Sequence, residues 1–195
     1  MNFNNVKKPL LIAVMLLGSS AVFAGDPNTP LPSAPYNQHV GAYFGGDLGA
    51  GLGASKDQSG DTQGGFEGFG GTATVGYQLN PNFGIEGDFT GISAPFSSTF
   101  YIYGAMLRAI LPLGDRVSLY AKAGGGAITV RVCDFLFNTG QCVSETQGAV
   151  LVGGGLTVAL SPNFDLAMDY TGGINNNNGM DGLYGVLGAG FLYHF

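Results

Sequence analysis

Residues 183–195 read Leu183-Tyr-Gly-Val-Leu-Gly-Ala-Gly-Phe-Leu-Tyr-His-Phe195, and this stretch decides the fold that we expect for the whole chain. Its aromatic residues Phe191, Tyr193 and Phe195 fall on alternate positions, which is the side-chain period of a β-strand and not that of a helix. The residues between them are smaller or mixed in character. The stretch therefore predicts a strand with one aromatic face, which needs a partner strand elsewhere in the chain.

The composition of the chain excludes several classes of protein. The 195 residues are too few for two large domains, and an apolar content of 45% is too high for a disordered chain. The 35 glycines have no three-residue period, which excludes a collagen-like helix. The net charge of -6 argues against nucleic-acid binding, which needs a basic surface. Tryptophan is absent, so tyrosine and phenylalanine must supply any aromatic belt.

The first residues have the parts of a secretory signal peptide. Two lysines at residues 7–8 precede an apolar run that is shorter than the ~20 residues of a membrane-spanning helix. Val22-Phe23-Ala24 then offers small residues at both cleavage positions. We therefore expect residues 1–24 to be removed as a signal peptide. Residues 25–39 are rich in proline and predict an extended periplasmic leader without its own core.

The two cysteines, Cys133 and Cys142, enclose a short segment late in the chain. Because export delivers a protein to an oxidising compartment, we expect a disulfide that closes this loop. A metal or redox role is not favoured, since no histidine or third cysteine is near in sequence. The apolar residues Phe135, Leu136 and Phe137 inside the loop either dock a partner or fold over the mouth of the barrel that the strand pattern predicts below, and the sequence leaves both alternatives open.

From residue 40 onward, apolar and polar residues alternate in eight short segments. The expected strands span residues 40–52, 69–79, 83–90, 101–111, 117–130, 148–160, 164–171 and 183–195. Tight turns at Asn80-Pro81-Asn82, Pro112 to Asp115 and Ser161-Pro162-Asn163 alternate with longer loops. Membrane barrels have this asymmetry, with short periplasmic turns and longer extracellular loops. The fold class that we predict for residues 40–195 is therefore all-β, an eight-stranded antiparallel up-and-down transmembrane β-barrel.

The charged residues of these strands share one face. All seven lie opposite the apolar face, and they are Asp47, Glu86, Asp88, Arg108, Lys122, Asp165 and Asp169. A soluble barrel would carry charges regularly on its outside, whereas here the apolar face is free of charge. We therefore expect lipid outside and, inside, a narrow polar lumen in which acids surround Arg108 and Lys122. Many glycines on the inner face predict extra room, so a narrow cation-preferring pore is the alternative to a salt-bridged core.

Three strand segments and the C-terminal residues resemble a known group of membrane proteins. They are Tyr43-Phe-Gly-Gly-Asp-Leu-Gly49, Val75-Gly-Tyr-Gln-Leu-Asn-Pro-Asn-Phe-Gly-Ile-Glu86, Leu119-Tyr-Ala-Lys-Ala-Gly-Gly125 and Gly190-Phe-Leu-Tyr-His-Phe195. The barrel resembles the OmpA-like/OmpX-like outer-membrane barrels and the related opacity and porin-family surface proteins. The resemblance implies that Gly190, Tyr193 and Phe195 belong to the terminal signal read by the barrel assembly machinery, although Gly188 replaces the polar residue of that signal. No peptidoglycan-binding domain follows, so we expect no cell-wall anchoring role.

The two histidines bear on an enzymatic role. Barrels that modify lipids need a histidine with a serine or an acid near the outer leaflet, whereas His39 and His194 belong to the end expected in the periplasm. Barrel closure should bring the two histidines onto neighbouring strands, but two histidines are not a complete set of metal ligands. We interpret them as interface polarity, and we predict no catalytic residues, no metal site and no cofactor.

The predicted function follows from this architecture. We expect an integral barrel of the bacterial outer membrane, with both termini periplasmic, that has a structural role and contacts host or matrix ligands through its extracellular loops. A narrow cation-preferring pore is the alternative, and a lipid-modifying enzyme is disfavoured. The expected partners are outer-membrane lipid and lipopolysaccharide, the barrel assembly machinery with periplasmic chaperones, and a host or matrix ligand. No nucleic acid is expected, and the protein should be a monomer.

Overall fold

A computed structural model describes residues 39–56, 62–94, 98–133, 142–175 and 182–195. The predicted signal peptide and nearly all of the predicted leader lie outside these residues, and so do Phe135, Leu136 and Phe137 of the cysteine loop. Within the described ranges, no helix is long and apolar enough to cross a membrane.

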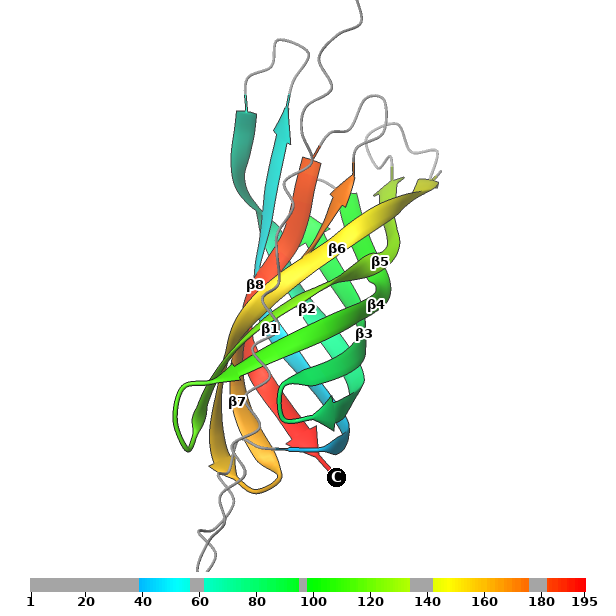
Figure 1. Cartoon of the computed structure of the whole chain (residues 1–195). Helices are drawn as coiled ribbons and strands as arrows, with labels where there is room; N and C mark the ends of the chain where they lie inside the picture. Colours follow the sequence, from blue (N-terminus) through cyan, green and yellow to red (C-terminus); the bar gives the residue numbers. More distant parts are fainter. Residues whose placement is uncertain (1–38, 57–61, 95–97, 134–141, 176–181) are drawn as a thin grey trace, which may run out of the picture. The chain divides into compact units, whose positions relative to one another are not determined.

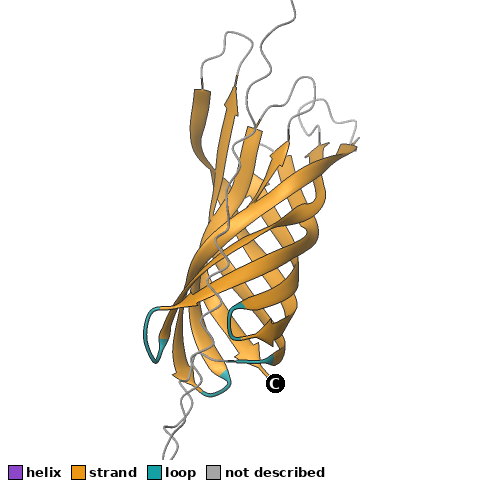
Figure 2. Cartoon of the chain, in the orientation of Figure 1, coloured by secondary structure: helices purple, strands orange, loops and turns teal. Residues whose placement is uncertain are grey.

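Antiparallel strands form one closed barrel, in which each strand pairs with its neighbours in the chain and β8 pairs with β1 (Figure 1). The strands are β1 (Gly41–Lys56), β2 (Thr62–Asn80), β3 (Phe83–Ala94), β4 (Ser98–Pro112), β5 (Val117–Cys133), β6 (Cys142–Ser161), β7 (Phe164–Asn175) and β8 (Gly182–His194). The short turns β2–β3, β4–β5 and β6–β7 lie at the end that holds the C-terminus, which we name the turn end (Figure 2). The opposite end is named the loop end. This topology confirms the predicted fold class.

The last strand closes the barrel against the first. Phe44 of β1 lies opposite Tyr193 of β8, and beyond the ladder the Phe195 amide donates to the Ala42 carbonyl at 3.1 Å. The rings of Phe44, Phe191, Tyr193 and Phe195 contact one another and form an outward aromatic cluster near the turn end. Closure gives every strand two partners, so the described sheet has no open edge, as a bilayer requires.

The strands continue further toward the loop end than the sequence predicts. Residues 54–65 are predicted as a loop, but β1 runs to Lys56 and β2 begins at Thr62. Polar and glycine residues can continue the ladder here because backbone groups make its hydrogen bonds. The register between the two strands shifts after Gly51, and Gly68 on β2 has a φ of 143°, a conformation that side chains rarely adopt. A glycine at this bulge therefore lets the hairpin extend beyond the predicted strands.

The outward face of the barrel wall is apolar. Leu48 is 79% exposed, and Val75, Leu107 and Leu166 are further large apolar side chains on this face. Among the side chains that the structure describes, Arg131 near the loop end is the only charged one on the outward face of a strand. Such a band would be unfavourable in water, but it matches the hydrocarbon core of a bilayer.

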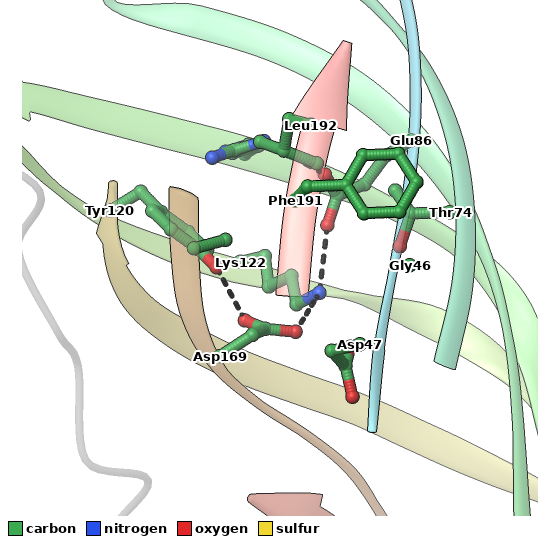
Figure 3. A pocket seen from close by; sticks show the side chains of 11 residues that line it. Gly46, Asp47, Thr74, Glu86, Tyr120, Lys122, Asp169, Phe191 and Leu192 are labelled. Carbon is green, nitrogen blue, oxygen red and sulfur yellow. Dashed lines mark hydrogen bonds and ion pairs between the residues drawn. The ribbon is translucent and has the colours of Figure 1, made fainter. Parts of the chain in front are cut away.

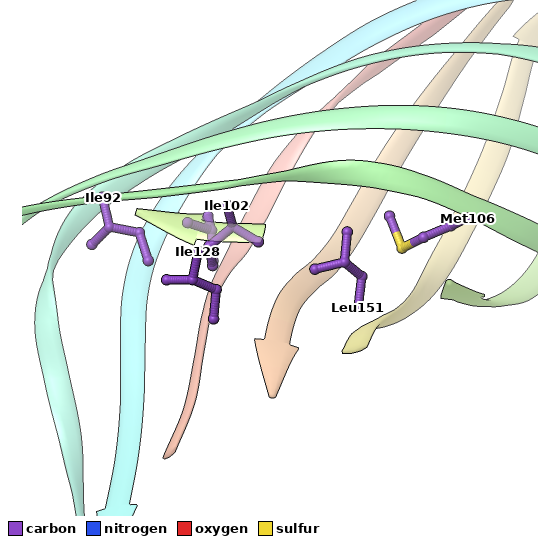
Figure 4. Packing of buried hydrophobic residues seen from close by; sticks show 6 residues of the cluster. Ile92, Ile102, Met106, Ile128 and Leu151 are labelled. Carbon is purple, nitrogen blue, oxygen red and sulfur yellow. The ribbon is translucent and has the colours of Figure 1, made fainter. Parts of the chain in front are cut away.

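Two layers of side chains fill the inside of the barrel. Nearer to the turn end lies a polar layer of charged residues and tyrosines (Figure 3). Nearer to the loop end lies an apolar layer (Figure 4), made of Ile92, Ile102, Met106, Ile128, Leu151 and Val186. The prediction of a polar lumen is therefore wrong for this half. Ile92 lies beyond the predicted end of its strand. Ile102 and Met106 share the inward face of Arg108, so alternation places them in the lumen without showing that the lumen changes from polar to apolar along its length.

Candidate functional site

Lys122 on β5 is the centre of the polar layer, and it is 5% exposed. It donates hydrogen bonds to Asp88 Oδ2 at 2.7 Å and to Asp169 Oδ2 at 2.9 Å. A third carboxylate oxygen, Glu86 Oε1, lies 3.0 Å from its Nζ and forms an ion pair without hydrogen-bond geometry. Figure 3 shows Lys122 extended between Glu86 and Asp169. The lysine thus connects β3 and β7, which are not its neighbours in the sheet.

Arg108 lies beside Lys122 and contacts two aromatic rings. The two cations are direct partners across β4 and β5, an arrangement that destabilises a sheet unless acids offset it. The Arg108 Cζ lies 3.9 Å from the centre of the Tyr120 ring and 5.6 Å from that of the Tyr43 ring. Its Nη1 lies 3.5 Å from Glu86 Oε2. Glu86 therefore contacts both cations and offsets their repulsion.

Hydroxyl groups complete the hydrogen bonding of the acids. Tyr43 donates to Glu86 Oε2 at 2.7 Å, and Tyr120 donates to Asp169 Oδ1 at 2.6 Å. Threonines of β2 and β7 donate to the carboxylates in the same way. Buried charges are tolerated only when they are paired and hydrogen-bonded, and this layer meets that condition at most of its atoms.

The polar layer encloses little free space. Its cavity has a volume of about 20 Å³, which is room for about one water molecule. Asp47 of β1 borders this cavity, and its Oδ1 has no hydrogen-bond partner among the described residues. The lumen is therefore nearly filled at this depth.

The structure separates the predicted charge network into two groups. The cluster contains Glu86, Asp88, Arg108, Lys122 and Asp169. Asp47 lies at the border of its cavity, whereas Asp165 lies apart, at the turn end. The sequence did not reveal Tyr43 and Tyr120 as partners of the cluster. Each tyrosine nevertheless lies on the same face of its strand as a charged residue that was predicted to point inward.

The inward glycines do not widen the lumen as predicted. A Cβ at Gly76 would overlap the Tyr43 ring, and a Cβ at Gly153 would overlap the Lys122 side chain. These large side chains lie across positions where the wall has no side chain of its own. The room that the glycines create is thus occupied by the residues of the cluster.

A second polar group lies at the turn end. Asp165, near the start of β7, lies between His39, which precedes β1, and His194, which ends β8. The Nε2 of His39 lies 3.3 Å from Asp165 Oδ1, and the Nε2 of His194 lies 3.3 Å from Asp165 Oδ2. The two imidazole rings are stacked, with centres 3.7 Å apart and an interplanar angle of 13°. Closure brings the histidines together as expected, and Asp165 adds a third possible ligand that the sequence did not place beside them.

Two further sets of predicted residues lie away from these clusters. Cys133 and Cys142 are direct backbone partners at the loop end of β5 and β6, which supports the predicted disulfide. Gly190 lies within β8, and Tyr193 and Phe195 belong to the outward aromatic cluster. The assembly role of these three residues stays a prediction.

Comparisons with known proteins agree with this architecture. Residues 10–195 match the family model of the outer membrane protein beta-barrel domain. Neisserial surface protein A is similar at 20% identity and a TM-score of 0.64, over 79% of this chain and 97% of that chain. Ail, the attachment invasion locus protein of Yersinia pestis, is similar at 21% identity and a TM-score of 0.52, over 80% of this chain and 100% of that chain. The N-terminal β-barrel domain of Pseudomonas aeruginosa OprF is similar at 11% identity and a TM-score of 0.52, over 80% and 98% of the two chains.

At these identities the solved structures show a shared fold and assign no function. No curated protein sequence matches the chain significantly. The family match, in contrast, covers nearly the whole sequence and agrees with the closed barrel and its apolar outer face. The chain therefore belongs to the outer membrane protein beta-barrel domain family, and it is a small eight-stranded barrel of the bacterial outer membrane.

Proposed function

We propose that this barrel is sealed and that it works as a structural and surface-contact protein of the outer membrane. The observation that carries the proposal is the filled lumen, in which the polar layer around Lys122 is followed by the apolar layer around Leu151. The turn end would then face the periplasm and the loop end the outside of the cell, as is usual for such barrels.

Both layers oppose the alternative of a cation-preferring pore. An ion that passes the polar layer must displace Lys122 from its carboxylates, and losing a partner from a buried ion pair costs about 3–5 kcal/mol. The cavity of about 20 Å³ has room for about one water molecule, far less than a hydrated ion occupies. The apolar layer adds a segment without polar ligands for an ion, and such constrictions close pores by dewetting.

The loop end provides a surface for contact. Inside the extended ends of β5 and β6 lies a hollow of about 250 Å³, whose lining includes Val130, Val132 and Val143 together with Glu145 and Gln147. Val132 and Val143 are exposed. Apolar side chains beside polar ones are typical of surfaces that bind other molecules. This hollow supports a role in contacting a host or matrix protein.

The charge of the chain favours a protein ligand over a sulfated glycan. A structure of Yersinia pestis Ail contains the heparin analogue sucrose octasulfate. Polyanions bind through clusters of arginine and lysine, whereas the present chain has a net charge of -6. We therefore expect weak retention on heparin at physiological ionic strength.

A non-enzymatic role is also part of the proposal. Lipid-modifying chemistry would need a general base near the outer leaflet. Both histidines of the chain, His39 and His194, lie at the turn end instead. Incubation with labelled phospholipid and lipopolysaccharide should therefore release no product.

Planar-bilayer recording tests the sealed lumen. The reconstituted barrel should produce no discrete steps in membrane conductance, because the two layers leave no continuous path of water through the lumen. Cation-selective openings of the wild-type protein would refute the proposal and favour the alternative of a pore.

A loop exchange tests the surface role. Residues 134–141 would be replaced by a Gly-Ser segment of equal length, and a matched control would replace residues 176–181 in the same way. Cells that display each variant at equal surface density are compared for attachment to epithelial cells and to immobilised matrix proteins. Attachment should fall for the first exchange and not for the control. Equal attachment of wild type and both variants would remove the contact role and leave only the structural one.

A further inference from the structure

The turn-end cluster of His39, Asp165 and His194 is buried, and the proposed function does not use it. The side chains are only 10%, 5% and 7% exposed, respectively. We propose that these three residues bind one divalent transition-metal ion of the Zn²⁺ class. The ion would fasten the residue that precedes β1 to the two strands that complete the barrel.

The donor atoms of the cluster lie near the spacing of a metal site. Bonds from zinc to nitrogen and oxygen are about 2.0–2.2 Å long, so ligand atoms of a tetrahedral site lie about 3.3–3.6 Å apart. Each histidine Nε2 lies 3.3 Å from an oxygen of Asp165. One ligand atom from each of the three residues lies within 4.8 Å of the others, so binding requires the set to contract and the stacked rings to turn until both Nε2 atoms point at the ion. Two imidazoles and one carboxylate leave the fourth position to a water molecule.

The metal would replace protons that the same atoms can share. Without metal, each neutral imidazole can donate its Nε2 proton to the carboxylate of Asp165. Metal binding through Nε2 requires the carboxylate to be ionised and each neutral ring to carry its proton on Nδ1 instead, so the neutral rings release no net proton to solvent. Because both Nε2 atoms already lie against one carboxylate, neither ring has to exchange its nitrogen atoms.

Backbone contacts hold two of the three ligands in place. The His194 amide donates to the Asn163 carbonyl at 2.8 Å, and the Asn163 side-chain amide donates to the His194 carbonyl at 2.8 Å. Asn163 belongs to the turn that leads directly into Asp165. Tyr43 is the cross-strand partner of His194, and its ring lies 5.5 Å from the His194 ring. His39 precedes β1 and lies outside the strand ladder, so the ion would order this residue most.

The chemistry of the donors selects the class of ion. Two imidazole nitrogens suit Zn²⁺, Ni²⁺ or Cu²⁺, whereas Ca²⁺ and Mg²⁺ prefer six or more oxygen ligands. A cluster with one carboxylate and two imidazoles should therefore discriminate strongly against the alkaline-earth ions. Magnesium and calcium at the lipopolysaccharide surface would not occupy it.

Isothermal titration calorimetry tests the site with the untagged mature protein in detergent micelles. A polyhistidine tag must be absent, because its histidines would bind Zn²⁺ themselves. The chain has only 2 histidines of its own, and both belong to the site. Zn²⁺ should bind with a stoichiometry of one ion per barrel, and Ca²⁺ and Mg²⁺ should give no heat of binding. Loss of a residue that only supports a metal ligand weakens binding by about 10–100-fold, so the ligand substitutions H39Q, D165N and H194Q should each weaken it by at least that factor.

Two controls keep the test decisive. The substitution D115N removes an exposed acid from another turn of the same barrel end and should leave Zn²⁺ affinity unchanged. H39Q changes a residue outside the strands, so this variant should fold even where D165N or H194Q does not. Zn²⁺ should raise the Tm of the wild type and of D115N but not that of H39Q. Absence of stoichiometric binding to the wild type, or equal affinity of the wild type and H39Q, would overturn the proposal.

Discussion

Substitution of Lys122 by methionine should destabilise the barrel by removing the cation that three acids share. In this variant Glu86 still contacts Arg108 and the Tyr43 hydroxyl, so losing the lysine costs this carboxylate little. Asp88, in contrast, keeps only threonine hydroxyls and becomes a buried acid without a cation. Since an orphaned buried charge costs about 3–5 kcal/mol, we expect K122M to lower the free energy of unfolding by that amount.

Equilibrium unfolding in urea, with the protein folded in phospholipid vesicles, measures this loss. The chain contains no tryptophan, so far-ultraviolet circular dichroism and the gel shift of the folded barrel replace intrinsic fluorescence. The outward, exposed Arg131 provides a matched control, because it has no acid partner among the residues that the structure describes, and R131M should change stability by less than about 0.5 kcal/mol.

A double variant tests the reason for the loss. If Asp88 is the orphaned group, then K122M/D88N should recover at least about 2 kcal/mol relative to K122M, as expected for contacting residues in a double-mutant cycle. Equal stability of K122M and wild type, or no recovery in the double variant, would show that the ion pairs do not hold the lumen.

Three further predictions concern the glycines, the seal and the closing strand. G153V should lower the free energy of unfolding by about 1–3 kcal/mol, because its side chain overlaps the Tyr170 carbonyl and the Lys122 side chain, and urea unfolding would show this against a wild-type-like G148V, whose Cβ has open space. The double variant K122A/L151A should give discrete bilayer openings, whereas either single variant should stay closed because one layer still blocks the lumen; a closed double variant would contradict the two-layer seal. Deletion of Phe195 should lower the amount of barrel in purified outer membranes more than it lowers stability in detergent, and normal membrane levels would argue against its role in assembly.

Alternation of side chains was sufficient to predict the fold. Ala42 and Phe44 alternate with Tyr43 in β1, and the same period repeats in every strand, so the sequence shows which residues face lipid. The three tight turns gave the order of the hairpins. The inward direction of Lys122 followed from the same rule. These features depend on local sequence, which is why a single chain reveals them.

Features that depend on barrel register could not be predicted from the pattern. The distances from Lys122 to Asp88 and Asp169 follow from how β3, β5 and β7 are staggered around the lumen, and no local signal encodes this stagger. Asp165 shares its inward face with Asp169, but its place four residues nearer to the turn puts it beside His194 instead. Alternation predicts which face of the sheet a residue occupies. Predicting its partners also requires its depth along the barrel.

The shared contacts of Lys122 also constrain the order in which the barrel can enter the membrane. Glu86 and Asp88 are on β3 and Asp169 is on β7, so the full set of partners is present only once β7 has joined the sheet. An open sheet in the bilayer would present the lysine and its acids to hydrocarbon, at about 2–4 kcal/mol for a lysine at the midplane. Partly assembled sheets would therefore expose part of this network to lipid, and we expect insertion to be coupled to closure, with the complete set of ion pairs forming only after β7 has joined the sheet.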